Sequence, residues 1–329
     1  MSYPVLDLHC DMLFYLHKVP DASIMNSEEI GVSVPRLRQG NVRTQVMAMY
    51  TPTAPGSTVT GLSQLEHFHN MTAPGQPFVR IEEASDFALE ESIGALLSIE
   101  NASGFAEEEE SLDFSLLERY IQEAGPLAYI SFTHHDENRF GGGNYSDNVG
   151  LKRDGKALLE WLDGKRIPVD LSHSSDALAH GIFSHVDTQR LDVPIIASHS
   201  NFRPVCDHVR NLPDELAKEI IHRKGLIGIN FLRAYIHDTN PGKLDEQVAY
   251  GWSLPGAESC LALGADFFSP VGFPWPERFP LFFEEHSHAG TYPALLEKWE
   301  RQIPGFDAEA VASRNATEFF RKALFSEGE

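Results

Sequence analysis

Short apolar runs recur along the chain, and segments with a helical pattern lie between them. The runs lie near residues 5–9, 42–50, 95–100, 127–133, 167–172, 194–198, 226–231 and 260–265. Segments of helical period include SLLERYIQEAG, GKALLEWLDGK, DALAHGIFSHV and PDELAKEIIHRKG. Strands that alternate with helices form a parallel sheet, and eight such units close into a barrel. The pattern predicts an α/β fold of the (β/α)8 TIM-barrel type, and because such barrels commonly exceed about 250 residues, we expect residues 1–329 to form a single domain.

Many of the apolar runs end in a residue that can bind a metal or transfer a proton. The endings are His9 and Asp11 in LDLHCD, Glu100 in ALLSIE, His134 in LAYISFTH, His173 in PVDLSH, His199 in PIIASH and Asp266 in CLALGAD. A parallel barrel brings the carboxyl ends of all its strands to one face, so these residues should meet in space. The side-chain period of two in a strand also predicts that Asp7 lies on the same face as His9 and Asp11.

This set of side chains has the composition of a metal centre. Two divalent ions need about six nitrogen and oxygen ligands, with one carboxylate shared between them. We expect His9 and Asp11 to hold one ion, His173 and His199 to hold the other, and Glu100 to bridge them. Since no thiolate belongs to the set, zinc is the first expectation, with manganese or cobalt as alternatives.

A single histidine near a strand end is more often structural than a ligand, so the joint placement at successive strand ends carries the prediction. His180, His185 and His222 fall on predicted helices and are assigned structural roles. His286 and His288 form a loop pair that we expect to be exposed. Asp7 and Asp170 could support the ligating imidazoles, or they could hold backbone donors inside the barrel.

Two loops and the late segment of the chain are expected near the same rim. The stretches 52–61 and 139–150 are rich in Gly and Pro and follow the second and fourth predicted strands. Long loops of this kind in compact domains are often functional. Residues 267–293 should cross the rim before two closing helices.

Composition and charge exclude several classes of function. The net charge of −22, from 26 basic and 48 acidic residues, disfavours nucleic acid as a partner. The acidic run at 107–110 is expected to be solvated surface. No stretch of 18 apolar residues predicts a membrane span, and the amino terminus lacks the pattern of an export signal. We therefore expect a cytoplasmic protein that does not contact a membrane.

Three cysteines, Cys10, Cys206 and Cys260, cannot all pair, and none lies in a Cys-x-x-Cys motif. We expect them to be reduced and buried. Strand alternation should point Cys10 away from its two neighbours.

Over most of its length the chain resembles the membrane (renal) dipeptidase family of zinc metallopeptidases, within the amidohydrolase-like superfamily. VLDLHCDM looks like the family's His-x-Asp motif, and LLSIEN looks like its bridging-glutamate strand. YISFTHHDEN is similar to its Leu-Thr-His-x-x-x-Asn segment, while PVDLSHSS and PIIASHSN resemble its two later histidine strands. The segment VRNLPDE contains Arg-Asn-Leu-Pro-Asp, which is highly characteristic of the family.

The resemblance implies a dinuclear zinc-dependent dipeptidase, with the same five metal ligands that the strand ends suggest. It implies small peptide substrates, among them dipeptides with a D-residue at the carboxyl side, and a possible homodimer. It places Arg210 and His134 at the substrate and matches Asp266 to the aspartate that handles the substrate amine and the proton. Arg203 and Arg233 lie near Arg210 in sequence and could share its task.

The expected mechanism is attack of a metal-bridged hydroxide on the scissile carbonyl. His134 would stabilise the developing oxyanion, Asp266 would pass a proton to the leaving amine, and Arg210 would bind the substrate carboxylate. Catalysis would thus rest on Asp266 and His134 together with the bridging Glu100.

The chain departs from the family pattern at two places. Residues 265–269 read Ala-Asp-Phe-Phe-Ser where the family usually has Gly-Asp-Phe-Asp-Gly, and QVAYGWSLPGAESC lacks the usual His of the preceding helix. Two alternatives therefore stay open. One is another amidohydrolase-type enzyme acting on an amide or lactone, although such enzymes often begin with His-x-His. The other is a non-catalytic barrel homologue.

Overall fold

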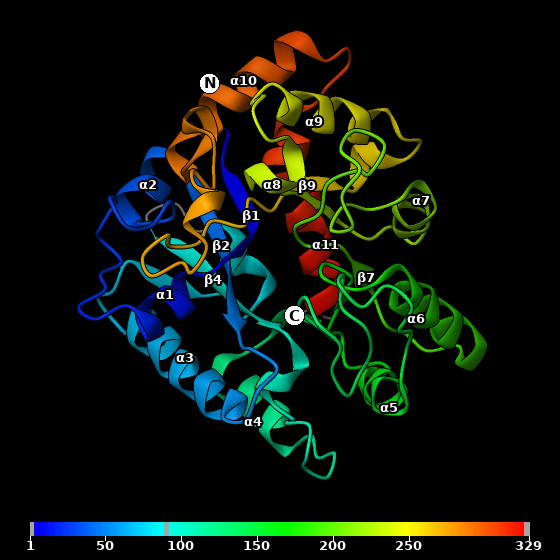
Figure 1. Cartoon of the computed structure of the whole chain (residues 1–329). Helices are drawn as coiled ribbons and strands as arrows, with labels where there is room; N and C mark the ends of the chain where they lie inside the picture. The colour runs from blue at the N-terminus through cyan, green and yellow to red at the C-terminus, as the bar shows by residue number, and fades with distance from the viewer. Residues whose placement is uncertain (1–2, 89–91, 326–329) are drawn as a thin grey trace.

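The structure is a computed structural model that describes residues 3–88 and 92–325. Eight parallel strands form its centre in the order β7-β6-β5-β4-β2-β1-β9-β8 (Figure 1). Their bounds are β1 Val5–Cys10, β2 Val42–Tyr50, β4 Ile93–Glu100, β5 Leu127–Ser131, β6 Val169–Asp170, β7 Ile195–Ile196, β8 Ile227–Ile229 and β9 Leu261–Leu263. An isolated parallel bridge between Ala197 and Ile227 links the two ends of this order, so the sheet is a nearly closed barrel. The predicted α/β barrel is confirmed.

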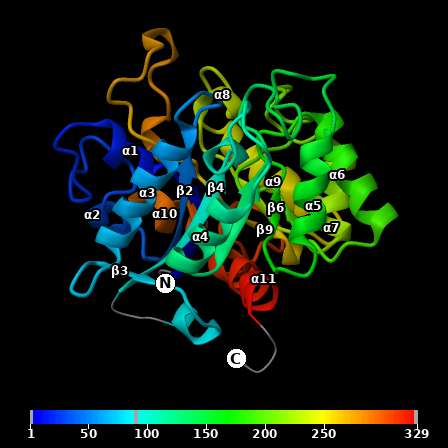
Figure 2. The ribbon, with the colours of Figure 1, turned by 90° about the horizontal axis from the view of Figure 1, so that it is seen from below.

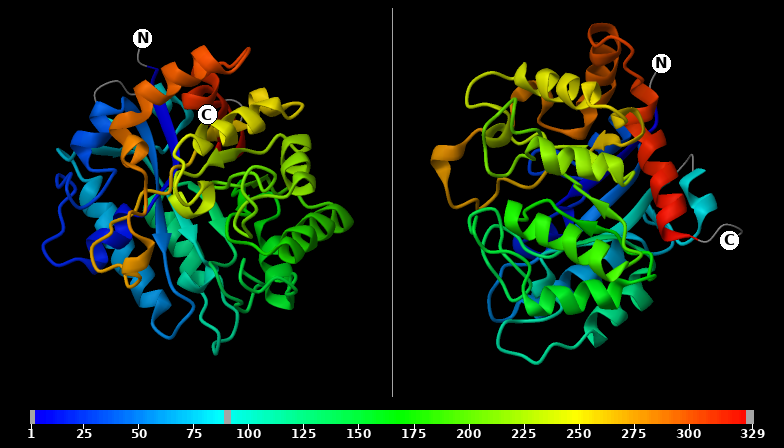
Figure 3. Two further views of the ribbon diagram at one scale, coloured as in Figure 1. Left: turned by 45° about the horizontal axis from the view of Figure 1, so that its top comes forward. Right: turned by 90° about the vertical axis from the view of Figure 1, so that its right-hand side faces the viewer.

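Helices surround the strands on the outside of the barrel (Figure 3). Their bounds are α1 Met12–Lys18, α2 Val34–Gln39, α3 Ser57–Met71, α4 Ser115–Ala124, α5 Arg153–Leu162, α6 Asp176–Gln189, α7 Asp214–His222, α8 Arg233–Ile236, α9 Lys243–Ser253, α10 Tyr292–Gln302 and α11 Asn315–Leu324. The four helices predicted from amphipathic segments are confirmed as α4 to α7. In α4, for example, Leu117, Tyr120 and Ala124 are buried at helical spacing.

One short strand, β3 (Phe78–Arg80), was not predicted. It pairs with the first half of β4, whereas β5 pairs with the second half, so β3 lies outside the closed order of the barrel. Three residues are too few for a pattern of hydrophobic alternation to identify a strand.

Apolar side chains from the strands fill the amino-terminal half of the barrel, and α11 covers that end. Leu6, Leu8 and Tyr129 belong to one buried cluster that also contains Phe320 and Leu324 of α11. Figure 2 shows α11 at one end of the barrel and α8 with the segment 267–285 at the opposite end. The polar carboxyl ends of the strands therefore open at the end that α11 does not cover.

The predicted orientation of Asp7 is wrong, because β1 does not keep a regular period. Asp7 pairs with Gln45 of β2 but Cys10 pairs with Met47, so β1 has one extra residue between the two pairs. The Asp7 carboxylate accepts hydrogen bonds from the His9 backbone N–H and from the Tyr292 hydroxyl of α10. Of the two roles left open for Asp7, the structure shows the backbone-donor role.

The loop pair His286 and His288 was expected to be exposed, and for His286 this is wrong. His286 is only 2% exposed, and its ring packs edge-on against Phe231 and Phe283. His288 is half-buried. The late segment folds back onto the barrel at this point, which a loop-like composition does not reveal.

The segment 52–61 and Glu107, the first residue of the acidic run, differ from expectation, whereas Glu108, Glu109 and Glu110 are exposed as predicted. Helix α3 begins at Ser57, so only the first half of the first segment is a loop. The Glu107 carboxylate accepts hydrogen bonds from the backbone N–H groups of Gly56 and Thr58. This glutamate therefore stabilises the start of α3, where a negative charge is favoured, instead of lying free in solvent.

The cysteines form no disulfide among the described residues. Cys10 and Cys260 are buried as predicted, and Cys10 packs in the cluster outside the barrel lumen. Cys206 is partly exposed, so its predicted burial is wrong. In the described part of the chain, no helix is both long and apolar enough to span a bilayer.

Candidate metal centre

The strand-end residues meet at the carboxyl end of the barrel, with Glu100 in the middle. Glu100 Oε1 lies 2.8 Å from His173 Nε2 and 3.7 Å from His199 Nε2. Its other oxygen, Oε2, lies 3.7 Å from His9 Nε2. The two oxygens of this carboxylate therefore face two separate groups of nitrogen ligands.

The described part of the chain contains four groups of possible ligand atoms, and in each group the atoms lie within 4.8 Å of one another. Two of them contain Glu100 and are the two sets that the sequence predicts: His9 with Asp11 and Glu100, and Glu100 with His173 and His199. The other two groups are His9, His199 and Asp266, and His134, His135 and His173. The two sets share only Glu100. The structure thus brings together all five residues that the strand ends suggested, and their division between two ions stays a prediction.

Hydrogen bonds hold two of the imidazoles in one orientation. The Tyr129 hydroxyl donates to the Leu8 carbonyl at 2.9 Å and lies 2.6 Å from His9 Nδ1. Because the hydroxyl proton is already used, the Tyr129 oxygen accepts a hydrogen bond from the Nδ1–H group of His9, and the Nε2 lone pair of His9 is left facing the acids. The carboxylate of Asp11 lies 4.0 Å from that Nε2.

His199 is held in the same way through a serine. Ser198 Oγ donates a hydrogen bond to Asp170 at 2.9 Å and lies 2.7 Å from His199 Nδ1. The serine oxygen therefore accepts a hydrogen bond from the Nδ1–H group of His199. Asp170 also accepts from the backbone N–H groups of Ser172 and Ser198. Both roles left open for Asp170 therefore apply, since it orients His199 through Ser198 and also binds backbone donors.

The backbone is strained where two of the side chains enter the site. His173 has φ of 69° and Asp266 has φ of 65°, in the left-handed region that side chains other than glycine rarely adopt. Such conformations persist only where the surrounding structure requires them, and they cluster at functional sites. Here they follow β6 and β9.

The electrostatics of the site fit a divalent cation. Burial lowers the pKa of His9 to about 3 and also lowers the pKa values of His173 and His199, so all three rings are neutral at pH 7, as ligands must be. Burial, and then repulsion by neighbouring carboxylates, raises the pKa values of Asp11 and Glu100 well above the usual range. His9 Nε2 is buried and has no hydrogen-bond partner. Buried acids that repel one another, beside neutral imidazoles, are what cations would stabilise, and the lone pair of His9 Nε2 is free to bind one.

Arg210 is a buried cation beside these ligands, with an exposed fraction of 2%. Its guanidinium contacts Ser200 Oγ at 3.3 Å and His173 Nε2 at 3.0 Å, while its Nε has no partner. No carboxylate lies within 4.0 Å of it in the described part of the chain. A buried guanidinium without a carboxylate partner is suited to bind an anionic group of a ligand.

His134 and Asp266 border the same space. His134 Nε2 lies 3.9 Å from Glu100 Oε1, and 22% of its side chain is exposed. Asp266 lies 3.7 Å from His9 Nε2 and accepts a hydrogen bond of 2.9 Å from Asn230 Nδ2. All eight site residues predicted from the sequence therefore lie at one end of the barrel.

The two other candidate arginines do not reach the site as free cations. Arg203 makes a two-point ion pair with Asp176, at 2.6 and 2.9 Å. Arg233 donates to the backbone carbonyls of Pro280, Asp238 and Arg278. Both guanidinium groups are engaged in holding loops.

Several residues of the site were not predicted. The His135 ring packs against His134 at a tilt of 51°, with ring centroids 4.0 Å apart, and its buried Nδ1 has no partner. Asn230 ends the apolar run GLIGIN, so the rule that identified the other strand endings also applies to it. Tyr129 precedes the strand end by a few residues, and nothing in its local sequence shows that it contacts His9.

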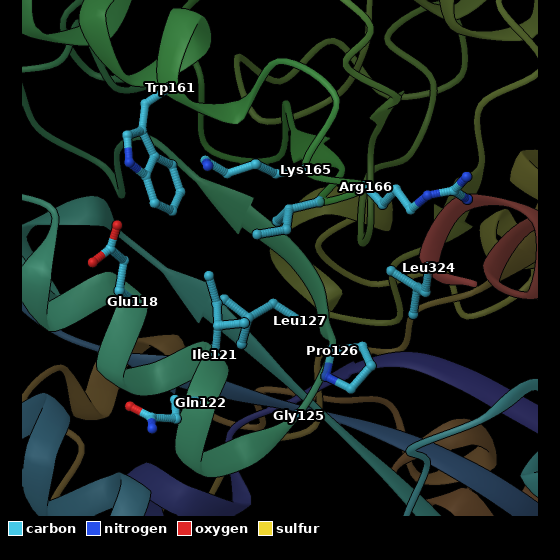
Figure 4. Close-up of a pocket in the computed structure, with 11 residues that line it drawn as sticks. Glu118, Ile121, Gln122, Gly125, Pro126, Leu127, Trp161, Lys165, Arg166 and Leu324 are labelled. Atoms are coloured by element: carbon cyan, nitrogen blue, oxygen red, sulfur yellow. The ribbon is translucent and has the colours of Figure 1, made fainter. Parts of the chain in front are cut away.

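A cavity of about 340 Å³ adjoins this end of the barrel and is lined by residues that include Tyr145, His208 and Tyr235. A second cavity, of about 590 Å³, lies between α4 and α5, where Trp161 and Leu127 border it (Figure 4). It is located at the amino-terminal ends of β5 and β6, and none of the predicted site residues lines it.

Comparison with known proteins places this site in a family. Residues 1–322 match the profile of the membrane dipeptidase family, peptidase family M19. Dipeptidase 3 of Rattus norvegicus is 24% identical over 341 residues, covering 98% of this chain and 65% of its own length. Dipeptidase aclJ of Aspergillus oryzae is 23% identical, covering 86% of this chain and 72% of its own length. The chain spans between 52% and 65% of the first three curated relatives that it matches.

Solved structures share the fold at low sequence identity. A dipeptidase AC, described as a metallo peptidase of family M19, superposes with a TM-score of 0.82 and 18% identity, covering 98% of this chain and 99% of the other. A metallo peptidase from Rhodobacter sphaeroides, liganded with a phosphinate mimic of the dipeptide L-Ala-D-Ala, gives a TM-score of 0.81 and 18% identity, covering 98% and 100% of the two chains.

Proposed function

The chain belongs to the membrane dipeptidase family, peptidase family M19, and we propose that it is a dinuclear zinc-dependent dipeptidase. The observation that carries this proposal is the position of Glu100, whose two carboxylate oxygens face His9 on one side and the pair His173 and His199 on the other. One carboxylate shared between two sets of imidazole and carboxylate ligands is the arrangement that a two-metal site needs.

Each of the five residues has one role in this proposal. His9 and Asp11 would hold one ion, His173 and His199 would hold the other, and Glu100 would supply a carboxylate oxygen to each. When bound, zinc ions polarise a carbonyl oxygen and lower the pKa of a water molecule towards neutrality. Zinc is preferred because the set contains imidazole and carboxylate groups, which also accept manganese or cobalt.

Three further residues bind the substrate and move its protons. Arg210 binds the terminal carboxylate of the peptide, since its free Nε and buried position match a two-point contact. His134, which is neutral because burial lowers its pKa, donates a hydrogen bond to the carbonyl oxygen as negative charge develops there. Asp266, held by Asn230, accepts a proton from the attacking water and transfers it to the leaving amine.

The substrates are dipeptides, because Arg210 binds the terminal carboxylate and the family resemblance assigns the free amine to Asp266, and contacts with both ends exclude longer chains. Dipeptides with a D-residue at the carboxyl side belong among the substrates to be tested. The support for including them is the solved relative from Rhodobacter sphaeroides, which binds a mimic of L-Ala-D-Ala.

The test is release of free amino acids from L,L and L,D dipeptides by zinc-loaded protein, with a chelated sample beside it. Glu100→Gln should abolish turnover, whereas Glu118→Gln, on the exposed face of α4, should not change it. N-acyl amino acids and lactones complete the panel. Turnover restricted to these compounds would favour another amidohydrolase-type activity, and no turnover with two metals bound would favour a non-catalytic homologue.

Three expectations stay predictions: one domain over residues 1–329, a cytoplasmic location and a homodimer. Limited proteolysis tests the first and cell fractionation tests the second. Light scattering of the purified chain, whose mass is 36.7 kDa, tests the third.

A further inference from the structure

The cavity of about 340 Å³ lies next to Arg210, the residue proposed to bind the substrate carboxylate. The Arg210 guanidinium lies 5.3 Å from the centre of the Tyr235 ring, and Tyr235 packs against His208 with ring centroids 4.9 Å apart. Both rings line the cavity. A side chain attached beside a carboxylate at Arg210 would therefore extend into this space.

Another residue that lines the cavity is linked to the metal centre by ring contacts. Tyr145 lines the cavity and stacks on His135, with ring centroids 4.8 Å apart. His135 in turn lies 4.9 Å from the His173 ring. Two residues that line the cavity are therefore linked to the site: Tyr235 contacts Arg210 directly, and Tyr145 contacts His173 through His135.

The wall contributed by the segment after β9 is apolar. Leu232, Tyr235 and Leu281 form a buried cluster, against which Phe268 and Phe273 pack. The rings of Phe268 and Phe273 are 5.7 Å apart. Figure 2 shows the segment 267–285 and α8 together at this end of the barrel.

Phe268 occupies the position where the family pattern has its second acid. The substitution places a phenyl ring two residues after Asp266, where a carboxylate would be expected, and that ring supports Phe273 on the cavity wall. The departure from the family pattern therefore changes the surface of the cavity and leaves the metal ligands unaltered.

The segment is held over the cavity by Arg233 at the start of α8. Its guanidinium donates to the carbonyls of Pro280 and Arg278 at 2.6 and 2.7 Å, and its backbone N–H donates to Leu281 at 2.9 Å. These bonds fix the apolar wall relative to Tyr235.

The charged residues of the cavity give no preference for either sign. Arg233 is engaged by backbone carbonyls, and Arg278 stacks over Trp275 at 5.0 Å. Asp238 and Glu277 also line the cavity, so it contains two cationic and two anionic side chains. The apolar part of its surface is the wall that contains Leu232, Leu281 and Phe273.

We propose that this cavity is the subsite for the side chain of the substrate's carboxyl-terminal residue, and that Phe268 and Phe273 make it select large apolar side chains, above all aromatic ones. This inference rests on the proposed dipeptidase function. One methylene in an apolar pocket changes kcat/KM by about 10-fold to 200-fold, so the benzyl side chain of Phe in place of the hydrogen of Gly should be favoured by at least about 100-fold.

The experiment measures kcat/KM of the zinc-loaded full chain on Ala-Gly, Ala-Leu, Ala-Phe, Ala-Glu and Ala-Lys. Wild type should prefer Ala-Phe and Ala-Leu over Ala-Gly. Phe273→Ala should lower the ratio of Ala-Phe to Ala-Gly by about 10-fold or more, and Phe273→Leu should restore most of it. Val271→Ala, an exposed residue of the same segment that does not line the cavity, is the matched control and should leave the ratio unchanged.

The possible failures are distinguishable. If no dipeptide is hydrolysed, the proposed function is wrong. If dipeptides are hydrolysed but Ala-Gly is used as well as Ala-Phe, or Ala-Glu or Ala-Lys is preferred, the subsite proposal is wrong. A ratio unaffected by Phe273→Ala, in protein whose circular dichroism matches wild type, would also overturn it.

Discussion

Replacing Glu100 with Gln should remove both metals at once, because this one carboxylate faces both ligand sets. Gln keeps the size of the side chain but loses the charge, so each ion loses an anionic ligand. Removing a residue that merely supports a ligand weakens metal binding by about 10-fold to 100-fold, which sets a lower bound for a ligand itself. Each tenfold loss corresponds to about 1.4 kcal/mol, so each ion should lose at least about 1.4 to 2.7 kcal/mol of binding free energy.

His199→Ala is the matched comparison, because His199 belongs to only one of the two proposed ion-binding sets. After dialysis against a weak competing chelator, elemental analysis should find about two zinc ions per wild-type chain, about one in His199→Ala and close to none in Glu100→Gln. Turnover of a dipeptide should be lost in both variants. If Glu100→Gln kept two ions, or kept full activity, the bridging role would be refuted.

Glu100→Gln should stabilise the fold of the metal-free protein, although it weakens metal binding. Burial and the charges of Asp11 and Asp266 raise the pKa of Glu100, so its ionised form destabilises the metal-free fold. A carboxyl group whose pKa is higher in the folded state than in the unfolded state destabilises the fold as the pH rises above the unfolded pKa. That pKa is about 4.3 for glutamate. The neighbouring histidines titrate in both wild type and Glu100→Gln, so their contribution to the pH dependence of stability cancels when the two proteins are compared.

The thermal midpoint of chelated Glu100→Gln should therefore exceed that of chelated wild type, and the difference should grow as the pH rises from about 4 towards neutrality. In the presence of zinc, wild type should have the higher thermal midpoint. Calorimetry on both proteins with and without chelator measures this. A variant less stable than wild type in both conditions would show that Glu100 is only a structural residue.

Three further predictions concern the residues around the ligands. Arg210→Ala should keep both metals and raise KM by about 100-fold, because a buried charge-assisted contact with the substrate is lost. Steady-state kinetics measures this, and an unchanged KM would count against the role of Arg210 in substrate binding. Tyr129→Phe should weaken zinc binding by about 10-fold to 100-fold, measured by chelator competition, because His9 loses the partner that sets its tautomer; unchanged affinity would contradict the assignment. Asn230→Ala should lower kcat more than metal content, because Asp266 loses its donor at 2.9 Å.

The fold and the ligand set could be predicted because both follow from local patterns. An apolar run that ends in His, Asp or Glu identifies a strand and its rim residue together, and barrel geometry then brings the rim residues into one place. His173 and His199 are 26 residues apart in sequence, yet their Nε2 atoms are 2.9 Å apart. No knowledge of side-chain packing was needed for that prediction.

The failures arose where the local pattern is broken. Regular alternation placed Asp7 with His9, but the extra residue in β1 turns the Asp7 carboxylate towards Tyr292 on α10. Tyr292 lies 285 residues from Asp7, and no local signal connects them. His286 is buried for a similar reason, since its partner Phe231 comes from the loop after β8. Contacts of this kind depend on tertiary packing, which hydrophobic periodicity does not describe.

The two halves of the barrel interior explain why folding and metal binding should be coupled. The amino-terminal half is apolar and covered by α11, whereas the carboxyl half contains Asp11, Glu100 and Asp266, each within 4.0 Å of His9 Nε2. Burial raises the pKa of Asp266 to about 7, and each pKa unit corresponds to about 1.4 kcal/mol, so these acids oppose folding in the absence of a cation. The apolar half must offset that cost in the metal-free chain. Cations that bind only the folded state remove it, which is why the stability of this protein should depend on zinc concentration as well as on the packing of its core.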